Sequence, residues 1–313
     1  MREAALFVTG IFMSVNIGLS ASGAYAKAPL AHLRAPSVYP VPEAVRQSGT
    51  EIVLRHLARA PEQRYFLYVP PRAGSGARVF VAVHGISRNA EEHARRFKRL
   101  ASQYGVVLVA PLFPREDFPD YQRLGQSGEG ERPDRALRAI LDDVGTLTGA
   151  DVGQIYLFGY SGGGQFAHRY AMAYPDRVAA VAIGAAGWYT FPDSTACFPR
   201  GLKTRSKWLK SRLRPEAFLK VPMAAFVGER DVRRGPERPE MKQSVKLDAQ
   251  QGLTRLERGQ HWIEAMRAAA ADYDLPTRYV YSVLPHASHS FKASMMHGMG
   301  QRVFAFLFGA PPG

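Results

Sequence analysis

Apolar runs that alternate with helical patterns constrain this chain's fold more than any other feature. Runs of strand character stand at residues Glu51–Leu57, Tyr65–Val69, Val79–Val83, Val106–Ala110, Ile155–Tyr160, Val178–Ile183, Met223–Val227 and Arg278–Leu284. From Val79 onward these runs are mostly uninterrupted, which is typical of strands buried on both faces. Helical patterns separate them at Ala90–Tyr104, Arg135–Thr148, Gly163–Tyr174, Arg258–Tyr273 and Gln301–Phe308. The pattern predicts an α/β domain whose mostly parallel central sheet has helices on both faces. The first two runs lie close together and predict an antiparallel hairpin at the N-terminal edge.

The first 50 residues differ from the rest. Arg2 precedes a short apolar run, and Ala24-Tyr25-Ala26 stands before Lys27, a pattern typical of a secretory signal peptide. A membrane anchor is the alternative, but the run is short and no basic stop-transfer cluster directly follows it. We expect residues 1–26 to be removed on export to the periplasm or the extracellular space, leaving no stable membrane span. Residues 27–50 are predicted to form an extended leader and residues 51–313 the domain.

Composition narrows the possible partners. The 313 residues are 46% hydrophobic, enough for one substantial core, and the net charge is +14. Such a charge favours anionic partners, but no helix-turn-helix, zinc-finger or aromatic RNA-binding pattern is present, so nucleic acid is not expected. Cys197 is the only cysteine, which excludes an intramolecular disulfide and a four-sulfur metal site.

A long segment at about residues 188–220 interrupts the alternation. It carries several aromatic residues and a group of lysines and arginines between Lys203 and Arg214. Long insertions in compact domains are often functional. The aromatic content predicts an ordered, lid-like insert with a cationic surface over the site; the alternative is that the basic residues only form a solvated face.

The strongest local motif is the G-x-S-x-G at residues 159–163, which contains Ser161. It follows an apolar run and begins a helical pattern. This context predicts a tight strand-to-helix turn that exposes the serine and needs small neighbours. The helix N-terminus also supplies free backbone N–H groups beside the serine oxygen. We therefore expect Ser161 to be a nucleophile.

At this motif the chain resembles the α/β-hydrolase superfamily. The resemblance extends over nearly all of residues 27–313, and within the superfamily the pattern is similar to secreted esterases of the polyhydroxyalkanoate-depolymerase-like and feruloyl-esterase-like branch. It rests on Val81-Ala82-Val83-His84-Gly85, the serine motif, Tyr174-Pro175-Asp176-Arg177-Val178, Gly228-Glu229-Arg230-Asp231 and His286-Ala287-Ser288-His289-Ser290. It implies an α/β-hydrolase fold with a catalytic triad in the order Ser, Asp or Glu, His.

The acid and the base follow from this order. Asp231 lies just beyond the run Met223–Val227, where the family places its carboxylate, and Asp193 after the preceding run is the alternative, with Glu229 third. His289 precedes a small and then an aromatic residue, as the family's histidine does, and His286 is the alternative base.

The resemblance also implies an oxyanion hole. Gly162, directly after the serine, supplies one backbone N–H. The second donor is assigned to Ile86, with Ser87 as second choice, in the loop that follows His84. His84 itself is expected to brace this loop. The chain lacks the H-G-G-G run of some lipases, which argues against a lipase.

The predicted activity is carboxylic ester hydrolysis through an acyl-enzyme, on a small or polymeric ester that includes anionic candidates. Peptidase or thioesterase activity on the same triad is an alternative, as is a non-catalytic binding protein that uses the basic insert. His286 and His289 form no convincing metal pair, because no third ligand stands out. Dinucleotide, phosphate-loop and H-E-x-x-H motifs are also missing, so we infer no cofactor and no metal.

Overall fold

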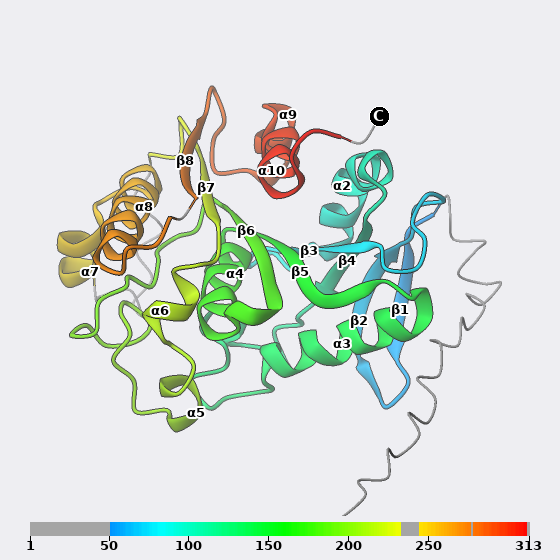
Figure 1. Cartoon of the computed structure of the whole chain (residues 1–313), viewed down its shortest axis with the longest axis horizontal. Coiled ribbons are helices and arrows are strands. Elements are labelled where there is room, and N and C mark those ends of the chain that lie inside the picture. The colour runs from blue at the N-terminus through cyan, green and yellow to red at the C-terminus, as the bar shows by residue number, and fades with distance from the viewer. Residues whose placement is uncertain (1–50, 233–243, 277, 312–313) are drawn as a thin grey trace, which may run out of the picture. The chain divides into compact units, whose positions relative to one another are not determined.

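Eight strands form one sheet in the part of the chain that this computed structural model describes, residues 51–232, 244–276 and 278–311 (Figure 1). The strands are β1 (Val53–Leu57), β2 (Ala60–Tyr68), β3 (Arg78–Val83), β4 (Val107–Leu112), β5 (Asp151–Tyr160), β6 (Val178–Gly184), β7 (Met223–Gly228) and β8 (Tyr279–Leu284). They lie in the order β1-β2-β4-β3-β5-β6-β7-β8. β1 and β2 form an antiparallel hairpin and β2 is antiparallel to β4, whereas all other neighbours are parallel. The predicted fold class is confirmed, including the hairpin at the N-terminal edge.

The helices connect these strands. Their bounds are α2 (Ala90–Tyr104), α3 (Pro133–Thr148), α4 (Gly162–Ala173), α5 (Lys207–Lys210), α6 (Pro215–Phe218), α7 (Ser244–Gln251), α8 (Arg255–Asp272), α9 (Phe291–Met296) and α10 (Met299–Phe308). The five predicted helical patterns correspond to α2, α3, α4, α8 and α10. The shorter α5, α6, α7 and α9 were not predicted, because they span too few turns to show a helical period.

Strand β3 shows why the apolar runs are uninterrupted. Val79, Val81 and Val83 belong to the core that includes α3, α4 and α8, whereas Phe80 and Ala82 belong to the core with α2 and α10. All five side chains are fully buried. In Figure 1, α2 and α10 lie on one side of the sheet and α3 on the other. Since neighbouring side chains of a strand point to opposite faces, burial on both faces requires apolar residues at every position.

Parallel pairing brings the carboxyl ends of the central strands to one edge of the sheet. Tyr160 at the end of β5 pairs with Gly184 of β6, and Gly228 at the end of β7 pairs with Leu284 of β8. The segments that follow these strands therefore leave the sheet at the same edge. Ligand sites of open α/β sheets form there, and the candidate site is built from these segments.

The long segment after β6 is a crossover, and only its first part lies near Ser161. Arg169, two turns into α4, stacks under Trp188 with 4.5 Å between its guanidinium carbon and the ring centroid. Further along, Arg212 stacks on Tyr174, at the opposite end of α4 from Ser161, about 20 Å along the helix. α6 packs beside this same end. The predicted cationic lid is therefore not formed by this basic half, because the chain must return to the amino end of β7.

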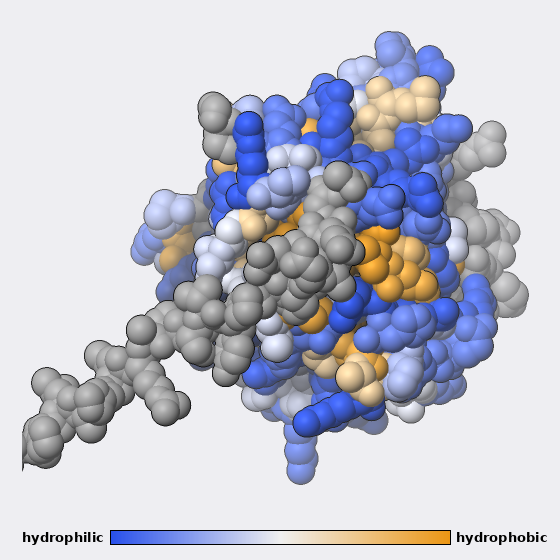
Figure 2. All heavy atoms as spheres, turned by 90° about the vertical axis from the view of Figure 1, so that its right-hand side faces the viewer, coloured by the Kyte–Doolittle hydropathy of each residue, from blue (hydrophilic) through white to orange (hydrophobic). Residues whose placement is uncertain are grey.

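The surface of the described residues is largely polar. Figure 2 shows a face on which hydrophilic residues predominate and apolar residues form separate patches. Among the helices of the described ranges, none is long and apolar enough to cross a membrane. The predicted signal peptide and leader, residues 1–50, lie outside the described residues.

Candidate active site

Ser161 lies in a tight turn between β5 and α4. Its φ of 53° and ψ of −111° fall in a region that non-glycine residues rarely adopt. The N–H of Ser161 donates to the carbonyl of Gly184 at 2.7 Å, and its own carbonyl accepts from the N–H of Gln165 at 3.2 Å. The turn thus fixes the serine at the N-terminus of α4.

The glycines of the motif are required by close backbone contacts. A Cβ on Gly159 would lie 2.0 Å from the carbonyl oxygen of Gly163, and a Cβ on Gly163 would lie 2.2 Å from that of Val83. Both distances are far inside van der Waals contact, and both neighbours are backbone atoms that cannot rotate away. Only glycine therefore allows β3, β5 and α4 to meet at this point.

Three side chains form a hydrogen-bonded line at the carboxyl edge of the sheet. Oγ of Ser161 is 3.2 Å from Nε2 of His289, and Nδ1 of His289 is 2.7 Å from Oδ2 of Asp231. The side chain of Asp231 is fully buried and that of His289 is 31% exposed. Because the carboxylate accepts a hydrogen bond from Nδ1–H of His289, the lone pair of Nε2 faces the serine hydroxyl.

Backbone hydrogen bonds hold the two turns of this line together. The N–H groups of Glu229 and Arg230 donate to the carbonyls of Leu284 and Ala287, both at 2.9 Å. A Cβ on Gly228 would lie 2.4 Å from the carbonyl oxygen of Ala287. The turn that carries Asp231 is therefore fixed against the turn that carries His289.

The residues after His289 explain the sequence pattern that identified it. Ser290 caps α9, where its hydroxyl accepts from the N–H of Ala293 at 3.3 Å. Phe291 is buried and stacks on His93 of α2, with ring centroids 3.7 Å apart. The small residue thus begins a helix and the aromatic residue anchors it. The ring of Tyr160 stacks on His289, with the ring centroids 5.7 Å apart.

The loop after β3 lies beside the serine. A Cβ on Gly85 would be 3.6 Å from Cβ of Ser161, and a Cβ on Gly162 would be 2.9 Å from the side chain of Ile86. The two residues predicted to supply oxyanion donors, Ile86 and Gly162, are therefore neighbours. Gly162 also packs closely against Gln122, which the sequence did not single out.

His84 braces this loop, as predicted. Its Nδ1 lies 2.8 Å from the carbonyl of Gly85, and its Nε2 accepts from the N–H of Phe113 at 3.0 Å. The hydroxyl of Tyr121 donates to the carbonyl of His84 at 3.0 Å. Burial lowers the pKa of His84 from 6.5 to about 4, so a neutral imidazole holds the loop at ordinary pH.

These features together match one architecture: a serine at a strained strand-to-helix turn, a carboxylate after β7 and a histidine after β8. A sequence profile of the alpha/beta hydrolase fold matches residues 81–224, which include the end of β3 and the serine turn. The chain has the α/β-hydrolase fold.

Known α/β-hydrolases resemble the chain at low identity. Feruloyl esterase B of Talaromyces funiculosus is 29% identical over 119 residues, 37% of this chain but only 34% of that protein. Poly(aspartic acid) hydrolase-1 from Sphingomonas sp. KT-1 superposes with a TM-score of 0.63 at 25% identity, covering 77% of this chain and 93% of that structure. The poly(3-hydroxybutyrate) depolymerase LpqC from Bordetella parapertussis gives 0.65 at 24% identity, covering 86% and 94%.

The alternative acid and base lie elsewhere in this hydrolase fold. A carboxylate oxygen of Asp193 accepts from the hydroxyl and the N–H of Thr195, and these bonds hold the pKa of Asp193 below its usual value. His286 is exposed, and its N–H donates to Glu229 at 2.8 Å. Within the described ranges neither Asp193 nor His286 is hydrogen-bonded to Ser161 or His289.

Arg255 is a site residue that the sequence analysis missed. Its Nη1 donates to Oδ1 of Asp231 at 3.0 Å, opposite the bond to His289. Arg255 is the first residue of α8, whose start is marked by a capping box between Thr254 and Glu257. That T-x-x-E pattern is readable from the sequence, whereas the helix was predicted to begin only at Arg258.

No described group of three or more His, Cys, Asp or Glu side chains is arranged to hold a metal ion.

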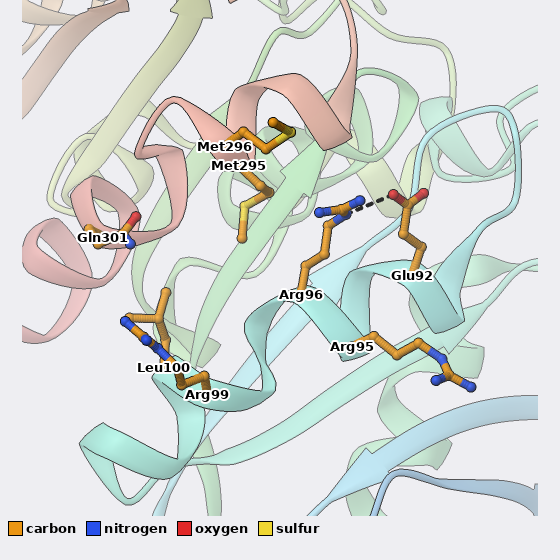
Figure 3. A pocket seen from close by; sticks show the side chains of 8 residues that line it. All are labelled: Glu92, Arg95, Arg96, Arg99, Leu100, Met295, Met296 and Gln301. Carbon is orange, nitrogen blue, oxygen red and sulfur yellow. Dashed lines mark hydrogen bonds and ion pairs between the residues drawn. The ribbon is translucent and has the colours of Figure 1, made fainter.

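A groove away from the serine lies between α2 and the α9–α10 segment (Figure 3), where Met295 and Met296 face a row of arginines. Arg95 and Arg96 are paired there with Glu91 and Glu92 one turn earlier. The groove therefore resembles an ordinary solvated helix face. It is separate from the hydrogen-bonded line of Ser161, His289 and Asp231.

Proposed function

We propose that this hydrolase cleaves carboxylic esters with Ser161 as nucleophile, His289 as base and Asp231 as the acid that orients the histidine. The observation that carries the proposal is the continuous hydrogen-bonded line from Oγ of Ser161 through His289 to the buried Asp231. Its support is the strained turn at Ser161 and the esterase and depolymerase relatives of the fold.

The proposed reaction has two balanced steps. Oγ of Ser161 attacks the ester carbonyl carbon while its proton passes to Nε2 of His289. The backbone N–H groups of Ile86 and Gly162 stabilise the oxyanion, and collapse of the intermediate expels the alcohol, which takes the proton from His289. Water then attacks the acyl-enzyme by the same route and releases the acid and Ser161.

The second candidate is hydrolysis of an anionic polymer at amide bonds. It is favoured by the likeness to poly(aspartic acid) hydrolase-1 and by the net charge of +14, which attracts polyanions. The same serine chemistry serves both substrates, since an amide and an ester pass through the same kind of tetrahedral intermediate.

A substrate panel tests both candidates. The full chain is assayed on short and long acyl esters, aryl esters, poly(3-hydroxybutyrate) and poly(aspartic acid), with Ser161→Ala as the control. Release of acid from esters by the native chain, absent from the variant, supports the first proposal. Cleavage of poly(aspartic acid) alone favours the second, and equal rates for native chain and variant contradict both.

A further inference from the structure

Arg255 and His289 share one buried carboxylate. Nη1 of Arg255 donates to Oδ1 of Asp231 at 3.0 Å, and Nδ1 of His289 lies 2.7 Å from Oδ2. The Asp231 side chain is fully buried, and that of Arg255 is 13% exposed. Both oxygens of the acid are thus engaged in a low-dielectric setting, where charge interactions are strong.

The helix that carries Arg255 is firmly fixed. Thr254 accepts from the N–H of Glu257 at 3.2 Å, and the Glu257 carboxylate accepts from the N–H of Thr254 at 3.1 Å. Gly259 packs against Val227 of β7, and Trp262 is fully buried. The guanidinium is therefore presented to Asp231 by a rigid element.

Among the described residues, the guanidinium of Arg255 has no polar partner besides Asp231. Its Nε is buried and has no hydrogen-bond partner among the described residues. Arg258, one turn later, contrasts with it: that arginine bonds the carbonyls of Gly252 and Gly187 and the carboxylate of Asp248. Arg258 ties structural elements together, whereas the described polar contact of Arg255 is to the site.

We propose that Arg255 is a positioning residue of the site, which fixes the orientation of Asp231 and offsets part of its charge. The proposal rests on the proposed function of the Ser161–His289–Asp231 line. A buried carboxylate with no second partner would stabilise a protonated imidazole strongly. The cation of Arg255 on the other carboxylate oxygen opposes this attraction, so the charge that His289 meets at Asp231 depends on Arg255.

Other titratable groups surround Asp231 and His289, and none of them is removed when Arg255 is replaced. The ring of Tyr160 on β5 stacks on His289, and Tyr189 lies within electrostatic range of Asp231 and Arg255. Three exposed titratable side chains lie on the two neighbouring turns, namely Glu229, Arg230 and His286. A change in pH dependence on replacing Arg255 alone therefore reports on Arg255.

The test is the rate at which a fluorophosphonate labels Ser161, followed by intact mass across neutral pH in the full chain. It needs no knowledge of the natural substrate. Arg255→Gln and Arg255→Met should move the midpoint of the rate–pH curve upward by about one pH unit, the order expected for a unit charge two hydrogen bonds away. Arg255→Lys, which keeps the charge, should stay near the native midpoint.

Arg258→Gln is the matched control. It removes a buried arginine from the same helix and should lower stability without moving the midpoint. Unchanged midpoints in both Arg255→Gln and Arg255→Met, or the same upward shift in Arg255→Lys, would overturn the role of Arg255. Failure of the native chain to be labelled at Ser161 would instead overturn the proposed function.

Discussion

Replacing Asp231 by asparagine tests how the carboxylate and its two neighbours act together. Asparagine has nearly the same volume but one accepting and one donating end. Arg255 can only donate, so the amide oxygen should turn toward Arg255 and the NH₂ group toward His289. Nδ1 of His289 must then accept a hydrogen bond from this NH₂ group, and the imidazole proton moves to Nε2, which faces Ser161. In this tautomer the imidazole cannot take the serine proton.

The size of the effect follows from the two bonds. Replacing the acid of a serine triad by its amide lowers turnover by about 10⁴, through the wrong tautomer and through loss of the charge that stabilises the imidazolium. In the opposite amide orientation the NH₂ group of the asparagine would face the N–H of Arg255. Two donors facing each other at a buried position cost about 1–3 kcal/mol. That energy corresponds to a preference of roughly 5- to 150-fold for the inactive orientation.

A second substitution should therefore recover part of the lost rate. In Asp231→Asn combined with Arg255→Met, no donor selects the amide orientation, and the oxygen can again accept from Nδ1 of His289. We expect the double variant to be faster than Asp231→Asn by about tenfold, within the range above. The assay is fluorophosphonate labelling or ester turnover at mildly alkaline pH, corrected for the folded fraction.

Arg255→Met alone completes the double-mutant cycle. On the native background it should slow the reaction or leave it nearly unchanged, whereas on the Asp231→Asn background it should speed it up. If the double variant is as slow as Asp231→Asn or slower, Arg255 does not select the orientation of the side chain at position 231.

Further predictions concern the base, the serine turn and low pH. His289→Ala should lower turnover by several orders of magnitude and His286→Ala by less than tenfold in the same ester assay; the reverse ranking would move the base to His286. Gly163→Ala, whose Cβ would lie 2.2 Å from the carbonyl of Val83, should lower the free energy of unfolding in urea by about 3 kcal/mol or more, and a loss below about 1 kcal/mol would contradict the close contact. Because burial lowers the pKa of His84 from 6.5 to about 4, protonation favours the unfolded chain. Stability should be full above about pH 6.5 and fall by up to about 3 kcal/mol toward pH 4; urea titrations that show no such loss would argue against a neutral buried His84.

The sequence was most informative where backbone sterics and burial dictate residue type. Mostly uninterrupted apolar runs marked the strands from β3 onward, whereas β1 and β2 at the edge lack such runs, and β2 begins at Ala60 and not at the predicted Tyr65. Gly159 and Gly163 marked the serine turn because nothing larger fits. The pattern after His289 reflects a cap and a buried anchor at the start of α9.

Contacts between distant segments were harder to predict. Arg255 and Asp231 meet only because α8 packs on β7, and no local pattern records that encounter. The basic half of the insert was expected over the site, but a crossover between parallel strands must run back to the opposite edge of the sheet. The positive charge of this segment does not indicate near which end of α4 the segment lies.

The most direct test of the central claim is active-site labelling followed by peptide mapping. Native protein is treated with a fluorophosphonate, and Ser161→Ala and His289→Ala are treated in parallel, with folding of each checked by circular dichroism. We expect one label per native chain, mapped to Ser161, no label on Ser161→Ala, and labelling of His289→Ala slowed by several orders of magnitude. A native chain that stays unlabelled, or a label that maps to another residue and persists in Ser161→Ala, would contradict the assignment of Ser161 as the nucleophile.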